Sequence, residues 1–237
     1  GVVTYSSYYS DNSNITDTVI SNCENRGTIT GGYDAGGVCE KTGSNVTVKN
    51  CINTGTVTSL RGRAGGITCY GSGTTVEDSA NLVTISGLKG AGGIAYRFEF
   101  SHSTSAERSG RWAGIIRNCY NAGTINGGAN SDYVAGIAAS NSGSLSSTIS
   151  PAISNEIENC YNVGKINCEA TGSSVRVGGI GGSHIQIVTA TNLYYLDTSA
   201  SAGIGYGLRA SKTAAVAKTE EELKSADFLA SLGEDRK

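Results

Sequence analysis

Short runs of β-branched residues recur along the chain, each bounded by Gly, Asn or Thr. The phrase Ile20-Ser-Asn-Cys-Glu-Asn-Arg-Gly-Thr-Ile29, followed by Ala35-Gly-Gly-Val38, shows the pattern. Val and Ile in runs of this length between turn residues favour strands over helices. We therefore expect each such unit to contain three short strands joined by tight turns.

The same phrase returns with substitutions. Further copies run from Val48 to Val57, Val76 to Ile85, Ile116 to Ile125 and Ile157 to Ile166, with a degenerate sixth copy at 190–195. Equivalent residues are 28 positions apart in the first copies (Cys23, Cys51, Ser79) and 40, 41 and 33 apart in the later ones. A core unit of about 28 residues therefore carries insertions in the middle of the array. Because Gly1-Val2 matches Gly37-Val38, we expect the chain to begin inside a longer array.

A single unit of this kind cannot bury its apolar face, so stacked copies must form the core. We predict an all-β parallel β-helix of five to six coils, right-handed because that hand prevails. At about 4.8 Å per coil the rod would be about 25–30 Å long. The solenoid is expected over residues 1–218, with long insertion loops near 95–115 and 138–156.

The C-terminal segment 219–237 carries the signals of a helix. Thr219 and Glu222 have the spacing of a capping box. The apolar residues that follow share one helical face: Leu223, Ala226, Leu229 and Ala230. We expect a short helix over 219–232 that caps the solenoid on or near its last coil. The alternative is a helix that binds a partner.

Two Asn columns are expected to stabilise the stack. The first consists of Asn22, Asn50, Asp78, Asn118, Asn159 and Asn192, and the second of Asn25, Asn53, Asn81, Asn121 and Asn162. Asn tolerates the left-handed backbone of a sharp corner, and stacked amides can hydrogen-bond from coil to coil. We interpret both columns as structural ladders and not as catalytic residues.

Cysteine follows the repeat as well. Four of the seven Cys occupy one repeat position, where Ser79 and Leu193 stand in other copies: Cys23, Cys51, Cys119 and Cys160. Interchange with small or apolar residues is typical of free, buried thiols. Neighbouring coils would also bring Cys pairs within disulfide range, although side chains in register point the same way and strain such a bridge. Cys-x-x-Cys and Cys/His spacings are missing, so we expect no metal site.

Composition narrows the function classes. Gly is 34 of 237 residues, about twice the usual share, and charged residues are only 16%. The formal net charge is −2, and without a basic stripe we expect no nucleic-acid partner. No apolar run approaches the length of a transmembrane helix, so we expect no direct membrane insertion. We expect no cofactor either.

Two features are candidates for ligand binding. The tyrosine column directly follows the Cys position and consists of Tyr120, Tyr161 and Tyr194. Facing outward it would form an aromatic stripe for a sugar chain, and facing inward it would be core packing. The first long insertion holds His102, Arg111 and Trp112, and loops on a rigid scaffold often carry function. The alternative for this insertion is a compact loop held together by its own aromatic residues.

Enzyme chemistry has little support in the sequence. His102 and His184 are the only histidines and lie far apart in repeat register, and the acidic residues are scattered. A glycosidase or lyase on a β-helix needs acids gathered on one face. We therefore expect no catalytic residues and no enzymatic activity, with a polysaccharide-processing enzyme as the weakest alternative.

The repeat Asn-Cys-Tyr-Asn-x-Gly-x-Ile, followed by Gly-Gly-Ile, resembles GLUG-type repeat regions of bacterial surface proteins. The most specific part is the closing segment, which ends Lys218-Thr-Glu-Glu-Glu-Leu-Lys-Ser-Ala-Asp-Phe228. The resemblance covers nearly the whole chain. It implies an extracellular module, wall-attached or secreted, of a Gram-positive bacterium.

On this resemblance we expect a non-catalytic module for adhesion or for presentation of other domains. Its partner would be a host or bacterial surface protein or a glycan, and the module would be monomeric within a longer multidomain chain. The alternative is a carbohydrate-binding module that uses the tyrosine column or a lobe formed by the two long insertions.

Overall fold

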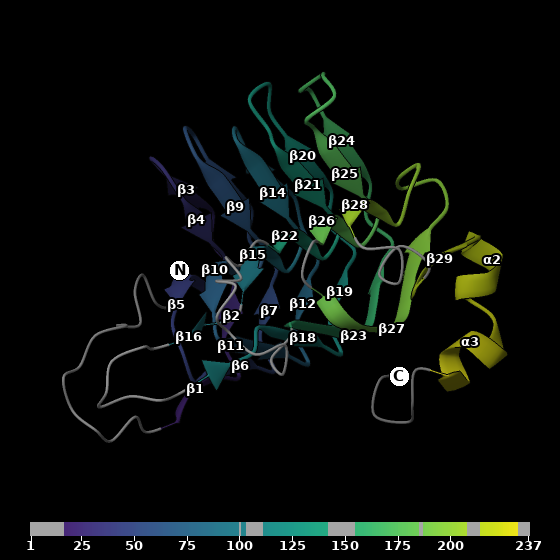
Figure 1. Ribbon diagram of the computed structural model, residues 1–237, viewed down its shortest axis with the longest axis horizontal. Coiled ribbons are helices and arrows are strands. Elements are labelled where there is room, and N and C mark those ends of the chain that lie inside the picture. The colour runs from purple at the N-terminus through teal and green to yellow at the C-terminus, as the bar shows by residue number, and fades with distance from the viewer. Residues whose placement is uncertain are drawn as a thin grey trace.

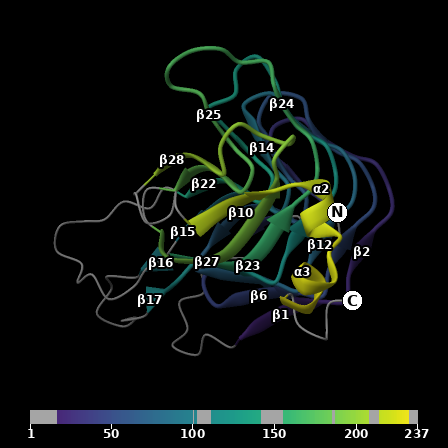
Figure 2. The same ribbon diagram turned by 90° about the vertical axis from the view of Figure 1, so that its right-hand side faces the viewer.

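The computed structural model describes residues 17–99, 101–102, 111–141, 155–184, 187–207 and 214–231. These residues form a parallel β-helix, as predicted, with five full coils and a sixth shorter one (Figure 1). Each of the first four coils passes through five short strands that belong to four sheets, and not through three strands as expected; in the fifth coil the first two strands are fused into one. Viewed from the C-terminal end, the chain turns counterclockwise as it advances toward the viewer, so the helix is right-handed (Figure 2).

Sheets A and B form the body of the rod. Sheet A contains β5 (Cys39–Thr42), β10 (Thr68–Ser72), β15 (Ala95–Glu99), β22 (Ala138–Asn141), β26 (Gly181–His184) and β28 (Ile204–Gly207). The first ladder of sheet B contains β1 (Thr18–Ser21), β6 (Val46–Lys49), β11 (Thr74–Glu77), β18 (Ile115–Arg117), β23 (Asn155–Asn162) and β27 (Ile187–Leu196). Its second ladder adds β2 (Glu24–Asn25), β7 (Ile52–Asn53), β12 (Ala80–Asn81) and β19 (Tyr120–Asn121), then continues through β23 and β27 to β29 (Ala215–Lys218).

Sheets C and D project from the body as a fin (Figure 1). Sheet C contains β3 (Ile29–Gly31), β8 (Val57–Ser59), β13 (Ile85–Gly87), β20 (Ile125–Gly127) and β24 (Ile166–Cys168). Sheet D contains β4 (Ala35–Gly36), β9 (Arg63–Gly65), β14 (Gly90–Gly92), β21 (Tyr133–Ala135) and β25 (Arg176–Gly178). The sixth coil contributes β27 and β28 but no strand to either fin sheet, so the fin ends one coil before the body.

Both long insertions leave the same corner, between sheet A and sheet B. The first begins with a two-stranded antiparallel ladder of β16 (Ser101–His102) and β17 (Arg111–Trp112). The second, residues 142–154, joins β22 to β23 and lies outside the described residues. The repeat register survives both insertions, because β18 pairs with β11 and β23 pairs with β18 at the predicted positions.

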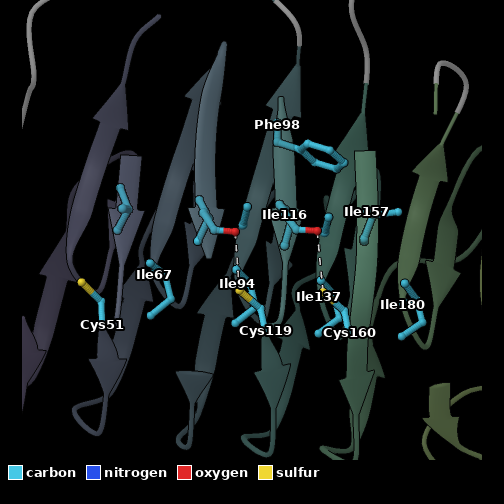
Figure 3. Packing of buried hydrophobic residues seen from close by; sticks show 14 of the residues in the cluster. Cys51, Ile67, Ile94, Phe98, Ile116, Cys119, Ile137, Ile157, Cys160 and Ile180 are labelled. Atoms are coloured by element: carbon cyan, nitrogen blue, oxygen red, sulfur yellow. Dashed lines mark hydrogen bonds between the residues drawn. The ribbon is translucent and has the colours of Figure 1, made fainter. Parts of the chain in front are cut away.

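The body and the fin have separate hydrophobic cores. The body core is built from columns of Ile and Cys side chains, among them Ile67, Ile94, Ile137 and Ile180 (Figure 3). The fin core lies between sheets C and D and stacks Val57, Ile85 and Ile125 against the Ala column of sheet D. The sequence predicted one core, and the separate core of the fin explains why each coil needs more strands than expected.

The first Asn column marks a corner in every coil, as predicted. All six members have positive φ angles, from 49° at Asp78 to 58° at Asn118. On the outer surface Asn118 donates to Asp78 Oδ1 (2.9 Å), Asn159 donates to Asn118 Oδ1 (3.2 Å), and Asn192 donates to Asn159 Oδ1 (2.8 Å). Asn and Asp tolerate this left-handed backbone better than other non-glycine residues.

The second Asn column lies buried at the neck where the body joins the fin. Each Nδ2 from Asn25 to Asn121 donates to the Oδ1 of the next member at 2.7 Å: Asn25 to Asn53, Asn53 to Asn81, Asn81 to Asn121, and Asn121 to Asn162. Asn53, Asn81, Asn121 and Asn162 are fully buried. A buried amide without partners would be costly, and these bonds give each buried amide a partner in the next coil. The predicted ladder is therefore confirmed.

Glycine on the opposite side of the neck makes room for this ladder. A Cβ at Gly93 would lie 2.6 Å from Asn121 Cγ and 1.9 Å from the Gly136 carbonyl oxygen, and one at Gly136 would lie 2.2 Å from Asn162 Cγ. No side chain fits at such distances. The second Gly of the Ala-Gly-Gly phrase is therefore required by the Asn of the next coil.

The Cys column lies inside the body core, and all seven Cys are free, as expected. Each of the four thiols in the column also donates to the carbonyl oxygen two residues before it, for example at 3.2 Å from Cys51 to Lys49 and at 3.1 Å from Cys160 to Glu158. Ser79 makes the same bond to Glu77 at 2.8 Å. Ser79 therefore keeps the hydrogen bond of the Cys that it replaces, whereas Leu193 in the sixth coil keeps only the apolar packing.

Replacing Asn121 with Leu tests the ladder. The change removes one of the two acceptors of the Asn81 amide, which keeps the Val83 carbonyl, and one of the two donors to Asn162 Oδ1, which keeps the Gly164 amide. We expect the free energy of unfolding to fall by about 1–3 kcal/mol, and the midpoint of thermal unfolding to fall by several degrees. Asn167→Leu is the control, because Asn167 bonds to Asn126 on the exposed face of sheet C. Equal melting midpoints for the two variants would contradict the ladder.

Thiol titration tests the burial of the Cys residues. Burial raises the pKa of Cys39 to about 12 and keeps the pKa of Cys119 well above its usual value. With a raised pKa the group stays protonated at pH 8, and the protonated thiol is unreactive. We expect Ellman's reagent to detect at most two thiols in the native chain, the half-buried Cys23 and Cys168, and all seven after denaturation. Fewer than seven in the denatured chain would reveal a disulfide.

Candidate binding face

The tyrosine column faces outward from sheet B. Cys119 and Asn121 point into the interior, and Tyr120 between them turns to the outer surface because side chains alternate along a strand. Tyr120 pairs with Tyr161 across the sheet, and Tyr161 pairs with Tyr194. All three are half-buried. Of the two orientations that the sequence left open, the structure has the outward one.

The rings of the column stack on one another. Tyr120 and Tyr161 have ring centroids 5.1 Å apart and planes within 4° of parallel. Each ring therefore turns a face toward its neighbour and leaves mainly an edge for the solvent. A sugar binds an aromatic residue through the ring face, so this geometry argues against the predicted stacking of a sugar chain along the column.

The C-terminal residues 214–231, which we name the strap, cover one end of the column. Strand β29 pairs with β27 and extends sheet B beyond the sixth coil. Two short helices follow, α2 (Glu220–Leu223) and α3 (Ala226–Ser231), in place of the single helix expected over 219–232. The helices lie beside the outer face of sheet B at the C-terminal end of the rod (Figure 2).

The predicted capping box begins α2. The Glu222 amide donates to Thr219 Oγ1 (3.2 Å), and the Thr219 amide donates to Glu222 Oε2 (2.8 Å). This bond from the Thr219 amide lowers the pKa of the Glu222 carboxyl group. The chain then turns at Ser225, whose hydroxyl accepts from the Phe228 amide (3.2 Å) and begins the second helix. Because a new helix begins after Ser225, the strap has two short helices and not the single continuous helix that was predicted.

Phe228 joins the strap to the tyrosine column. Its ring lies perpendicular to those of Tyr194 and Tyr161, with centroids 5.1 and 6.4 Å away. Only 8% of Phe228 is exposed, although α3 is a surface helix. Perpendicular packing of this kind stabilises aromatic pairs beyond the area that they bury. Phe228 therefore holds the strap against the sheet.

A cavity of about 390 Å³ lies between the strap and the sheet. The sheet side is formed by Tyr161, Val163 and Leu196, and the strap side by Leu223, Phe228 and Leu229. Glu220 and Lys224, which form an ion pair with each other, complete the lining. The size and the mainly apolar lining are those of a binding pocket.

For the residues predicted to form a site in the first insertion, the structure describes the backbone pairing and not the side chains. His102 lies opposite Arg111, and Ser101 opposite Trp112, in the ladder of β16 and β17. The side chains of His102, Arg111 and Trp112 lie outside the described residues, so the predicted insertion site stays a prediction.

A cluster that the sequence analysis missed occupies the inner angle between sheets D and A. Arg63 donates to the Tyr70 hydroxyl (3.0 Å), and its guanidinium lies 5.3 Å from the ring centroid of Tyr96. Burial raises the pKa of Tyr70 to about 12. A Cβ at Gly90 would lie 2.5 Å from the Tyr96 ring, so this glycine admits the ring. The signal in the sequence is the variable position before Ala-Gly-Gly, which holds Arg63 in one coil and Gly90 in the next.

Comparisons with protein-family models, with curated proteins and with solved structures return no match. Across the described ranges, no helix is long and apolar enough to cross a membrane. The same residues bring together no group of three His, Cys, Asp or Glu side chains that is placed to hold a metal ion.

Replacing Phe228 with Ala tests how the strap is held. Losing the ring removes the contacts with Tyr161 and Tyr194, so the strap should open more often while the coils stay folded. We expect trypsin to cleave after Lys218 and Lys224 at least tenfold faster, with the main thermal midpoint unchanged. Asp227→Ala, on the same helix but exposed and outside the cavity lining, is the control and should change the rate little. Equal cleavage rates for the two variants would contradict this role of Phe228.

Proposed function

We propose that the chain is a non-catalytic extracellular module that presents other domains at a bacterial surface, as its resemblance to GLUG-type repeat regions implies. Of the two roles expected from the sequence, adhesion and presentation, the geometry supports presentation better. A presenting module must hold its two ends at a fixed separation and orientation.

The observation that carries the proposal is the buried Asn ladder. It runs from Asn25 to Asn162, through five consecutive coils, with every amide-to-amide distance at 2.7 Å. Backbone pairing in all four sheets follows the same register. Because hydrogen bonds of this kind fix the position of each coil on the next, the rod resists bending and twisting at the neck.

The acidic residues of the rod support a structural role. Glu77 accepts from Arg117 on the next coil (2.6 and 2.8 Å), and Glu99 pairs with Arg97 (3.0 Å). Asp34 accepts from the Arg63 backbone amide (3.0 Å). Glu77 and Asp34 connect neighbouring coils, and Glu99 binds Arg97 of its own strand, which are different tasks from acid–base catalysis.

Antibody labelling of intact cells tests the surface location. We expect antibodies raised against the purified chain to label intact cells of the bacterium that encodes it as strongly as permeabilised cells. Antibodies against a cytosolic protein of the same bacterium provide the control and should label only permeabilised cells. Labelling that needs permeabilisation would overturn the proposal.

A reducing-end assay on a panel of polysaccharides tests the non-catalytic part. We expect no product above the heat-inactivated sample. Turnover that persists with fresh substrate would overturn this part and would favour the enzyme alternative.

A further inference from the structure

The tyrosine column belongs to a longer apolar stripe on the outer face of sheet B. The stripe consists of two adjacent columns, Ile52, Ala80, Tyr120 and Tyr161 in one, and Leu82, Ala122 and Val163 in the other. The strap covers the stripe only at its C-terminal end, through Phe228. Farther along, Ile52 is 41% exposed and Leu82 is 40% exposed. Ala80, between Ile52 and Tyr120, is buried. Exposed apolar side chains gathered on one face mark an interaction surface more often than scattered ones do.

The chain itself shows what kind of partner fits this stripe. In the strap, the short helix α3 packs an aromatic ring perpendicular to the tyrosines, while the charged residues Glu220 and Lys224 at the two ends of α2 stay at the surface. The uncovered part of the stripe continues the same two columns in register. A second helix with the same chemistry would therefore meet the same kind of surface.

The cavity lies where the covered and uncovered parts meet. Tyr161 and Val163, which form its sheet side, are the last members of the two columns before the strap. The next residues outward, Tyr120 and Ala122, belong to the uncovered part. An apolar side chain seated in this cavity would therefore lie in line with the rest of the stripe.

We propose that the apolar stripe binds an amphipathic helix of another polypeptide, which lies along the rod and places its first apolar side chain in the cavity. Coils are spaced at about 4.8 Å, and a helix rises about 1.5 Å per residue. Side chains at i, i+3 and i+7 are thus about 4.5 and 10.5 Å along the helix from the first, close to one and two coil spacings. They would meet the coils of Tyr161, Tyr120 and Leu82. Helices bind apolar grooves through anchors at these positions.

The proposal goes beyond presentation of other domains, because it assigns a partner class to one face and holds wherever the chain resides. It commits to a separate polypeptide and not to a second copy. The described helices of this chain are α2 and α3, and both already pack on its own sheet B.

A labelled peptide with the strap sequence, residues 217–231, is the probe. Fluorescence anisotropy would follow its binding to the full chain. We expect saturable binding to the wild-type chain, and no binding of the same peptide carrying Ala in place of the residue equivalent to Phe228. No saturable binding of the unchanged peptide would overturn the proposal.

Variants of the chain locate the binding surface. We expect Leu82→Glu to weaken binding at least tenfold, because it places a charge in the middle of the stripe. Leu60→Glu is the matched control: Leu60 is 58% exposed but lies beyond β8 on the fin, so binding should stay within twofold. Unchanged thermal midpoints would show that both variants are folded.

Three outcomes would contradict the proposal. Binding that survives Leu82→Glu would mean that the peptide displaces the chain's own strap at Tyr194. Equal loss in both Glu variants would mean a non-specific apolar contact. Dimers of the wild-type chain that disappear in Leu82→Glu would make a second copy the occupant of the stripe.

Discussion

The rod depends on a contact between amide and glycine at its neck. A buried Asn must satisfy its amide on both sides, and in-register stacking lets each coil satisfy the next at 2.7 Å. The same Asn leaves no space for a side chain across the neck, so Gly93 and Gly136 stand opposite. The body and the fin are therefore joined by an Asn ladder that can form in only one register of the coils. Shifting a coil by one residue would leave several amides buried without partners.

Much of the fold was predictable because the repeat itself aligns the columns. Asn118 and Asn159 were expected at left-handed corners and have φ angles of 58° and 50°. The number of strands was not predictable in the same way. Nothing in the alternation of Ile125 with Gly and Asn says that this residue belongs to a second core. That division depends on where the chain crosses the rod, which is a tertiary property.

The candidate binding face was also predictable only in part from the sequence. Sequence position placed Tyr120, Tyr161 and Tyr194 in one column but left open which way they point. The capping box at Thr219 predicted where the strap begins, yet its turn at Ser225 and the contact of Phe228 with Tyr194 arise from packing against the sheet. Arg63 and Tyr96 were missed because the inner angle that brings them together exists only when sheets D and A meet.

The position of the insertions has a consequence for how the chain folds. Each coil contacts mainly its neighbours, so the search for native pairs spans about one coil at every step, and folding can propagate outward from any pair of adjacent coils. Both insertions lie at the corner between sheets A and B and lengthen only the loop closed at that step. Because the entropy of loop closure grows slowly with length, going from 28 to about 41 residues between paired positions adds only a few tenths of a kcal/mol. The corner between sheets A and B is thus a place where the rod can accept new segments with little slowing of folding.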